Sequence, residues 1–350
     1  MKVAAYAAHG AEQPLEPVTI ERRALLADDV AIDITYCGVC HSDIHTARNE
    51  WGGARYPCVP GHEIIGRVTD VGAEVSSFKK GDLVGVGCMV DACLNCPSCH
   101  DGDEQYCERG AVMTYGGADP HLGGHTHGGY SKRIIVRDKF VLRIPENLDE
   151  KAVAPLLCAG ITTWSPLAHW YIGKDDRVGV IGLGGLGHMG VKFANALGAQ
   201  VTMITTSPKK GEDARKLGAH EVLLSTDKAQ MKSARGKFDF LLNTVPVAHE
   251  MNPYMGLLAR NGTMVLVGAI EPMPGFHAGL LLANRRRVAG SGIGGIKETQ
   301  DMLDFCGEHN IVADVEMVDI QEINTAWDRV VKADVKYRFV IDMKSLPDAV

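Results

Sequence analysis

Residues 177–206, RVGVIGLGGLGHMGVKFANALGAQVTMITT, constrain the fold more than any other stretch. An apolar run, a glycine turn, a helical pattern and a second apolar run occur within about 30 residues, which predicts strand, helix and parallel strand. The turn between the first strand and the helix reads G-x-G-x-x-G, a spacing that aims backbone N–H groups at a pyrophosphate. The candidate dinucleotide contacts are Gly182, Gly184, Gly185, Leu186 and Gly187. A glycine turn in another α/β fold is the alternative.

The alternation of strand and helix continues to about residue 269, which predicts a doubly wound parallel sheet of the Rossmann type. Residues 1 to about 150 instead carry short β-like runs separated by glycine, proline and charged residues. At 350 residues, two domains are expected. We therefore predict an α/β protein with a dinucleotide-binding domain over 154–291 and a mostly β domain built from 1–153 and 292–350.

Charge and hydropathy exclude several classes of protein. The formal net charge is -7 and the basic runs are short and isolated, so a phosphate-backbone footprint for nucleic acid is not expected. No uninterrupted apolar run approaches the roughly 18 residues of a membrane span, and the first residues lack a signal-like apolar core. These features favour the cytoplasm, where the ten cysteines are better candidates for metal ligands than for disulfides.

Four cysteines lie in one glycine-rich, polar loop with the spacing C-x2-C-x2-C-x7-C: Cys93, Cys96, Cys99 and Cys107. Four thiolates this close in sequence can close a tetrahedron around a zinc ion without help from the rest of the fold. A closed shell of sulfur has no open position for substrate, so the ion would be structural and would order the loop. Four unrelated cysteines or an iron–sulfur site are the alternatives.

The end of the second strand of the dinucleotide-binding domain indicates which cofactor binds. An NAD site should offer a carboxylate about 20 residues after the glycines, but 204–210, ITTSPKK, has none. Lys209 and Lys210 fall in the first turn of a helix that Ser207 caps and Pro208 begins, where the helix dipole disfavours cations unless a phosphate is bound. The sequence therefore favours NADP, with contacts from Thr206, Ser207 and Lys210; solvated lysines and NAD are the alternative.

Residues 36–45, YCGVCHSDIH, combine a C-x-x-C with two histidines four apart. The cysteines suit a redox dithiol or a zinc knuckle, and on a helix the histidines would share one face as a second metal pair. The residues by themselves leave these possibilities open.

Taken with VPGHE (59–63), LLCAGITTW (156–164), the four-cysteine loop and GLGGLG (182–187), this stretch makes the chain resemble the zinc-dependent alcohol dehydrogenases of the medium-chain dehydrogenase/reductase superfamily. More narrowly, it resembles the cinnamyl alcohol dehydrogenase branch and its bacterial NADP-dependent aldehyde reductases. The resemblance covers nearly the whole chain, including GSGIGGIKETQDMLDF and DVKYRFVIDM near its end. It implies a chaperonin-10-like fold for the catalytic domain and two zinc ions per chain.

The resemblance places three catalytic zinc ligands on Cys40, His62 and Cys158, a two-cysteine, one-histidine set that leaves a fourth position open. Cys37 is then expected to face the core. Glu63 matches a carboxylate near the zinc that can transiently replace a ligand, although a surface acid is the simpler interpretation. Asp43 matches the carboxylate that orients the zinc-bound histidine, or it caps a helix.

The remaining assignments concern the proton, the cofactor and the substrate. Ser42 and His45 match the proton relay from the substrate oxygen to solvent, and Thr162 a position beside the nicotinamide. His41 matches a residue facing the cofactor pyrophosphate, or is a solvated loop histidine. The candidate pocket residues, which could instead be core, suggest an apolar and adaptable site: Trp51, Met89 and Ile293. Three other cysteines are expected to be small buried residues: Cys58, Cys88 and Cys306.

The expected reaction is hydride transfer between NADP(H) and a primary alcohol/aldehyde pair, favouring reduction of aromatic and medium aliphatic aldehydes. An NAD-dependent alcohol or polyol dehydrogenase is the nearest rival, although polyol dehydrogenases resembling this family typically offer glutamate where Cys158 stands. A zinc-binding interaction module is the rival from another class, and the dinucleotide turn opposes it. The family resemblance also implies a homodimer, with a tetramer as the alternative.

Overall fold

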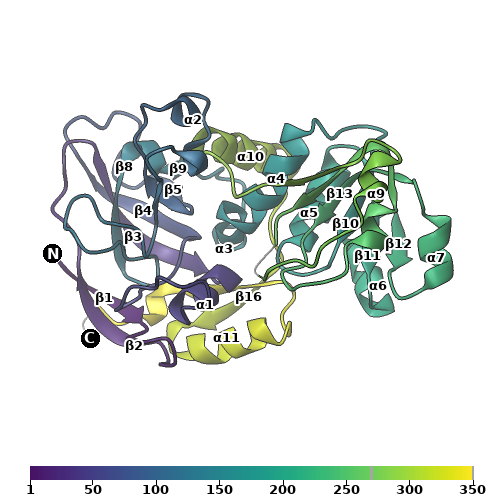
Figure 1. Cartoon of the computed structure of the whole chain (residues 1–350). Helices are drawn as coiled ribbons and strands as arrows, with labels where there is room; N and C mark the ends of the chain where they lie inside the picture. The colour runs from purple at the N-terminus through teal and green to yellow at the C-terminus, as the bar shows by residue number, and fades with distance from the viewer. Residues whose placement is uncertain (269–270, 349–350) are drawn as a thin grey trace. The chain divides into compact units, whose positions relative to one another are not determined.

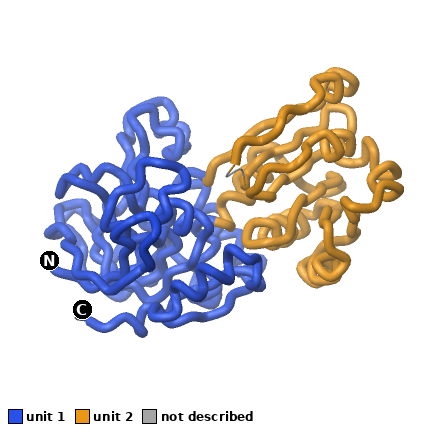
Figure 2. Tube along the Cα trace, turned by 60° about the horizontal axis from the view of Figure 1, so that its bottom comes forward, with its two compact units in different colours: residues 1–158, 294–350 blue, residues 159–293 orange. Residues whose placement is uncertain are grey.

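The computed structural model describes residues 1–268 and 271–348. The chain forms two compact units, one of residues 1–158 and 294–350 and the other of residues 159–293, which Figure 2 shows in separate colours. The chain therefore leaves the first unit once and returns to it once. Within the described ranges, no helix has the length and apolar character that crossing a membrane requires.

The second unit is built on a six-stranded parallel sheet with the strand order β12-β11-β10-β13-β14-β15. The strands are β10 (Arg177–Ile181), β11 (Gln200–Thr205), β12 (Glu221–Leu224), β13 (Phe238–Asn243), β14 (Leu258–Leu266) and β15 (Arg287–Gly290). The direction of the strand order reverses beside β10. Sheets of this kind bind nucleotides at such a switch point, at the carboxyl ends of the strands. The predicted doubly wound sheet is confirmed (Figure 1).

Apolar runs explain why these strands form the interior of the sheet. Val178, Val180 and Ile181 of β10 and most of β11 and β13 are buried, as expected for parallel strands covered by helices. The helices of this unit are α4 (Ala159–His169), α5 (Gly187–Ala196), α6 (Pro208–Lys216), α7 (Lys228–Ser233), α8 (Asn252–Met255) and α9 (Gly279–Leu282). Ser207 caps α6 and Pro208 begins it, as predicted.

The first unit is mostly β. Its main sheet has the order β16-β17-β3-β4-β5-β9, with β8 also paired to β3, and two hairpin-like pairs lie outside it. The strands are β1 (Lys2–Ala7), β2 (Glu16–Glu21), β3 (Asp29–Gly38), β4 (Ile64–Val71), β5 (Leu83–Val86), β6 (Met89–Asp91), β7 (Val112–Met113), β8 (Arg133–Arg137), β9 (Leu142–Arg143), β16 (Val315–Asp319) and β17 (Arg338–Asp342). The predicted mostly β domain is confirmed.

Short helices and turns connect the strands of the first unit. The helices are α1 (His41–Ala47), α2 (Pro97–His100), α3 (Glu150–Val153), α10 (Ile296–His309) and α11 (Ile323–Val331), and the 3₁₀ turns are η1 (Glu104–Tyr106), η2 (Asp138–Phe140), η3 (Ala154–Leu157), η4 (Ile320–Glu322) and η5 (Met343–Ser345). β17, near the end of the chain, pairs antiparallel with β3 near its beginning. This pairing brings segments from opposite ends of the sequence into contact beside the start of α1.

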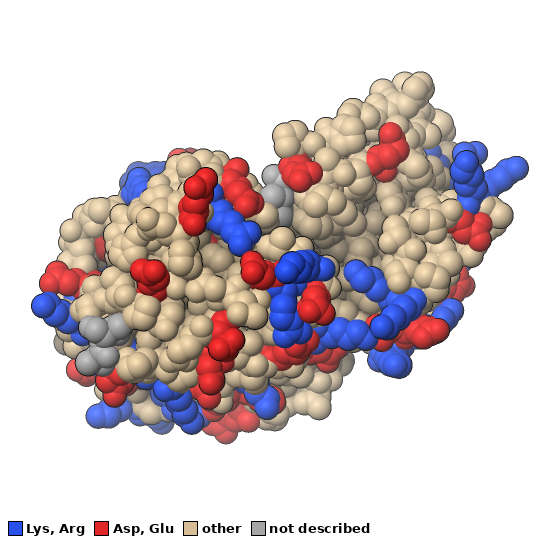
Figure 3. Space-filling view, turned by 90° about the horizontal axis from the view of Figure 1, so that it is seen from below, with Lys and Arg blue, Asp and Glu red and all other residues tan. Residues whose placement is uncertain are grey.

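Charged side chains are mixed on the face of the molecule shown in Figure 3, where acidic and basic groups lie next to one another over much of the surface. Several charged residues form ion pairs, such as Arg137 with Asp28 and Asp91, and Arg177 with Asp239. That face therefore lacks the continuous basic stripe that a polyanion would need.

Candidate active site

Four potential metal ligands converge in the first unit: Cys40, His62, Glu63 and Cys158, all buried, with ligand atoms within 4.8 Å of one another. Cys40 precedes α1, His62 and Glu63 precede β4, and Cys158 comes directly after η3. The Cys40 and Cys158 sulfurs are 3.8 Å apart, close to the separation that two Zn–S bonds of about 2.3 Å give in a tetrahedron. The Ser42 hydroxyl lies 3.5 Å from the Cys40 sulfur. This donor set fits a zinc ion.

A single buried carboxylate, that of Asp43, organises the cluster. It accepts hydrogen bonds from the backbone N–H groups of Cys40 (2.9 Å) and Gly61 (3.0 Å) and, at 3.3 Å, from the Tyr130 hydroxyl. Nδ1 of His62 lies 3.2 Å from the same carboxylate, which leaves Nε2 as the ligand atom. Asp43 thus caps α1 and also contacts the His62 ring.

Behind the cluster, Glu63 forms a fully buried ion pair with Arg338 of β17. Burial raises the pKa of Glu63 to about 7, an effect that the positive charge of Arg338 opposes. The second carboxylate oxygen of Glu63 has no hydrogen-bond partner among the described residues. A β-carbon on Gly38 would lie 1.9 Å from that oxygen, so glycine is required there to make room for it. A buried, unpartnered carboxylate oxygen beside the ligand set suits an occasional metal ligand.

The two histidines of α1 stack on each other, with ring centroids of His41 and His45 5.9 Å apart. The indole of Trp51, 49% exposed, packs against His45 at 5.4 Å between ring centroids. Nδ1 of His45 pairs with the carboxylate of Glu50, while its Nε2 is buried without a partner among the described residues. The histidines therefore do not form a second metal pair in this geometry; His45 is held by a carboxylate.

The four-cysteine loop forms the second cluster, with the sulfurs of Cys93, Cys96, Cys99 and Cys107 within 4.8 Å of one another. The Cys99 sulfur is 3.9 Å from that of Cys93 and 3.5 Å from that of Cys96. Donation from the Glu108 backbone N–H to the Cys96 sulfur lowers the pKa of that thiol to about 6. Thiolates at tetrahedral spacing fit a structural zinc ion.

Glycine geometry in the second unit fits a bound pyrophosphate. Gly182 has φ +90°, which favours glycine, and a β-carbon on Gly187 would lie 1.9 Å from the Gly182 carbonyl oxygen. A β-carbon on Gly184 would instead meet nothing within 4 Å, so the backbone is open there to close approach by a ligand. Gly185 and Leu186 complete the turn before α5.

The candidate phosphate contacts come directly after β11. Thr206 and Lys210 are exposed, and the Ser207 hydroxyl accepts the Lys210 backbone N–H at 3.4 Å. Thr162 is buried on α4 in the same unit.

The three candidate substrate residues have different surroundings. Met89 is buried on β6, Trp51 is half exposed beside His45, and Ile293 is half-buried with φ +43° in the second unit. Cys88, expected as an ordinary buried thiol, is buried but lies against Cys158, whose hydrogen bond lowers the pKa of Cys88.

Sequence reasoning missed several members of the site. Glu50 and Tyr115, whose ring lies 5.5 Å from that of His62, belong to no motif that it used. Arg338 lies within DVKYRFVIDM, which contributed to the family resemblance but was given no role in the site. One signal was available: an arginine within YRFVIDM, an otherwise apolar strand, predicts a buried charge with an acidic partner. Nothing local signals Glu50 or Tyr115.

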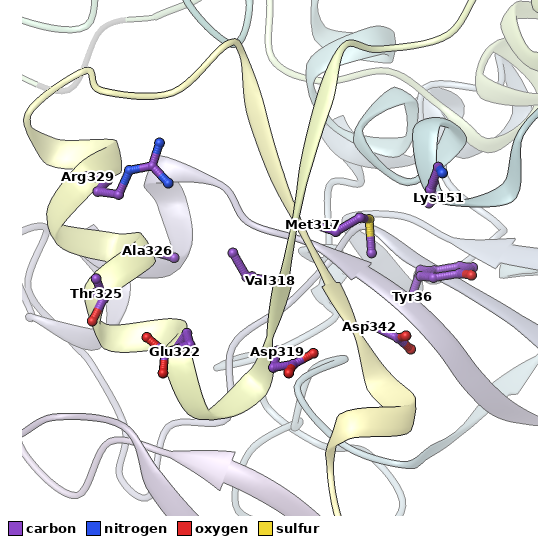
Figure 4. Close-up of a pocket in the computed structure, with 10 residues that line it drawn as sticks. All are labelled: Tyr36, Lys151, Met317, Val318, Asp319, Glu322, Thr325, Ala326, Arg329 and Asp342. Atoms are coloured by element: carbon purple, nitrogen blue, oxygen red, sulfur yellow. The ribbon is translucent and has the colours of Figure 1, made fainter.

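A groove of about 550 Å³ lies elsewhere in the first unit, along β16 and β17 (Figure 4). Charged side chains line much of it, including Lys151, Asp319, Glu322, Arg329 and Asp342. It includes none of the predicted metal ligands or relay residues and offers no thiol or imidazole. We therefore place the chemistry at the buried cluster.

Comparison with known proteins agrees with this geometry. Residues 26–146 match the family model "Alcohol dehydrogenase GroES-like domain", and residues 185–308 match "Zinc-binding dehydrogenase". The chain is 53% identical to aldehyde reductase YahK of Escherichia coli, over 99% of this chain and 100% of that protein. It is 52% identical to the NADP-dependent alcohol dehydrogenase C 1 of Mycolicibacterium smegmatis, over 98% and 99%.

Solved structures give the same result. A cinnamyl alcohol dehydrogenase from Sorghum bicolor superposes with a TM-score of 0.96 at 45% identity, covering 100% of both chains. The enzyme from Helicobacter pylori, complexed with NADP(H), has a TM-score of 0.92 at 40% identity, covering 98% of this chain and 99% of that one. The family models together with these full-length similarities establish that the chain belongs to the zinc-dependent medium-chain alcohol dehydrogenases, in the branch of the cinnamyl alcohol dehydrogenases.

Proposed function

We propose that the protein interconverts primary alcohols and aldehydes with NADP(H), at a zinc ion held by Cys40, His62 and Cys158. The observation that carries the proposal is the convergence of these ligands around an orienting carboxylate, Asp43. Zinc bound there would supply a Lewis acid that polarises the substrate oxygen. The domains would divide accordingly: residues 1–153 with 292–350 would hold the four-cysteine site and the ligands Cys40 and His62, and 154–291 would hold the dinucleotide and contribute Cys158 from its first residues.

The residues of the chain divide the remaining work. The Ser42 hydroxyl, next to the Cys40 sulfur, can donate a proton to the substrate oxygen, and His45 can resupply it. Glu50 holds the His45 ring in place through Nδ1. Glu63 would act as an occasional metal ligand beside the other three, and Arg338 would balance its charge.

The segment directly after β11 favours NADP. Thr206, Ser207 and Lys210 would contact the 2′-phosphate there, the glycine turn would contact the pyrophosphate, and His41 and Thr162 would face the pyrophosphate and nicotinamide. A relative named as NADP-dependent and a similar structure solved in complex with NADP(H) support this choice. We expect kcat/KM for NADPH to exceed that for NADH by at least roughly 100-fold, the effect of about 3 kcal/mol of lost phosphate contacts. Lys210→Ala should reduce this ratio, and equal values for the two cofactors in the wild-type protein would contradict NADP preference.

For the substrate, we propose aromatic and medium aliphatic aldehydes, with reduction as the favoured direction. Trp51 and Met89 would supply an indole face and a flexible thioether, and Ile293 an apolar wall. A screen of NADPH oxidation over aromatic, aliphatic, branched and polyhydroxylated substrates tests this. Preference for polyols would favour the polyol dehydrogenase alternative, which Cys158 at the third ligand position opposes.

We also infer a homodimer in the cytoplasm. β15 is an edge strand of the six-stranded sheet, and nearby Leu282 of α9 is 81% exposed, so pairing of two copies at this edge would cover both. Reduced thiols at both metal clusters suit a reducing compartment. Light scattering on the purified protein should give twice the chain mass of 37.7 kDa, and a monomer would contradict the dimer.

A further inference from the structure

Tyr115 is a buried residue next to the proposed metal ligands, and it lies outside the sequence motifs that supply those ligands. Its ring centroid lies 5.5 Å from that of His62, with the planes tilted by 31°. The preceding residue fixes its position, because Thr114 donates its backbone N–H to the Cys88 carbonyl at 3.0 Å and its hydroxyl to that of Gly87 at 2.6 Å. The Tyr115 ring is therefore a fixed surface against which the imidazole packs.

The hydroxyl of Tyr115 is directed to the other support of that imidazole. It interacts with the side chains of Asp43 and Thr46, both on α1. Asp43 is the carboxylate that faces Nδ1 of His62 at 3.2 Å. One side chain thus contacts the ring of the histidine and also the group that fixes its tautomer.

We propose that Tyr115 is a positioning residue for metal capture, which holds His62 with Nε2 facing the Cys40 and Cys158 sulfurs. This inference rests on the proposed assignment of His62 as a zinc ligand. Loss of an outer support of a metal-bound histidine typically lowers metal affinity by about 10–100-fold. Without the ring, the imidazole regains rotational freedom, and zinc binding must then restrict it.

Three variants of the zinc-loaded protein separate the ring from the hydroxyl. Tyr115→Met fills a similar volume without a ring, Tyr115→Phe keeps the ring, and Tyr130→Phe removes a different hydroxyl from Asp43 without touching the ring contact. The measurement is the rate at which each of the two zinc ions passes to a chromophoric chelator, with metal content determined by mass spectrometry. The zinc of the four-cysteine loop is the internal control.

We expect Tyr115→Met to release one zinc ion roughly 10–100-fold faster while the other leaves at the wild-type rate, and Tyr115→Phe to restore most of the retention. Release of both ions faster to the same extent would show general destabilisation and overturn the proposal, as would a wild-type rate in Tyr115→Met. If that variant does not fold, Tyr115→Leu provides the same comparison. A wild-type protein that holds no zinc ion beyond that of the four-cysteine loop would instead overturn the ligand assignment itself, so the two failures are distinguishable.

Discussion

The four-cysteine loop draws all its ligands from residues 93–107, whereas Cys40, His62 and Cys158 come from three segments 22 and 96 residues apart. The first cluster is supported by its own loop, through backbone N–H groups that point at the sulfurs. The second depends on Asp43, which is close to Cys40 in sequence, and on two groups from distant segments, Tyr130 and Arg338. A local cluster can order a loop. A cluster assembled from distant segments can leave one coordination position open, and its supporting groups can adjust the charge and orientation of the ligands.

If the assembled cluster carries the chemistry, removing one of its ligands should have the largest effect. His62→Ala is expected to lose one zinc ion per chain and to lower NADPH-dependent aldehyde reduction by at least roughly 1000-fold, since Lewis-acid stabilisation is worth several kcal/mol. The four-cysteine zinc should remain. Metal analysis and turnover check this; two zinc ions with turnover within tenfold of wild type would contradict the assignment.

The distant supports of the assembled cluster should matter nearly as much. Arg338→Met leaves the buried Glu63 charge without its partner and is expected to destabilise the first unit by about 3–5 kcal/mol. Adding Glu63→Gln to this variant should recover part of the loss, because the uncompensated charge is then gone. Urea unfolding monitored by tryptophan fluorescence measures the stability of the single and the double variant. An unchanged unfolding midpoint in Arg338→Met would show that the Arg338–Glu63 pair does not stabilise the unit.

Breaking the local cluster should affect stability without removing the catalytic metal. Cys107→Ser is expected to lose the structural zinc and lower Tm by roughly 5–10 °C, because the loop then loses the binding energy that orders it. Cys58→Ala, at a buried cysteine outside both clusters, is the control and should keep two zinc ions. Loss of both ions from Cys107→Ser would show that the two clusters are not independent.

The smallest effect sharpens the assignment of the proton relay. Ser42→Ala should lower turnover about 100-fold, the scale typical of a positioned proton-transfer group. Both zinc ions and the affinity for NADPH should be unchanged, since Ser42 contacts the Cys40 sulfur from outside the ligand set. Near-normal turnover, followed by NADPH absorbance, would remove Ser42 from the relay.

The contrast between the clusters also separates what was predictable from what was not. The four-cysteine loop could be interpreted from spacing alone, and the glycine turn from its position between strand and helix. The assignment of Cys40, His62 and Cys158 instead needed the family resemblance, because nothing in YCGVCHSDIH distinguishes a ligand from Cys37. In the structure, Cys37 is fully buried on β3 and lies outside the ligand set.

Local patterns by themselves determined the alternating strands and helices, the cap of α6 by Ser207 and the four-cysteine cluster, since each depends on groups that are close together along the chain. Only the tertiary structure placed Arg338 behind Glu63, Tyr115 against His62 and Glu50 beside His45. The first two contacts join segments far apart in the sequence, and the third spans a turn after α1 with no helical period. These contacts depend on the register of the strands and on which side chains are buried, because an unpaired charge in the interior is costly. Neighbouring residues alone specify neither the register nor the burial.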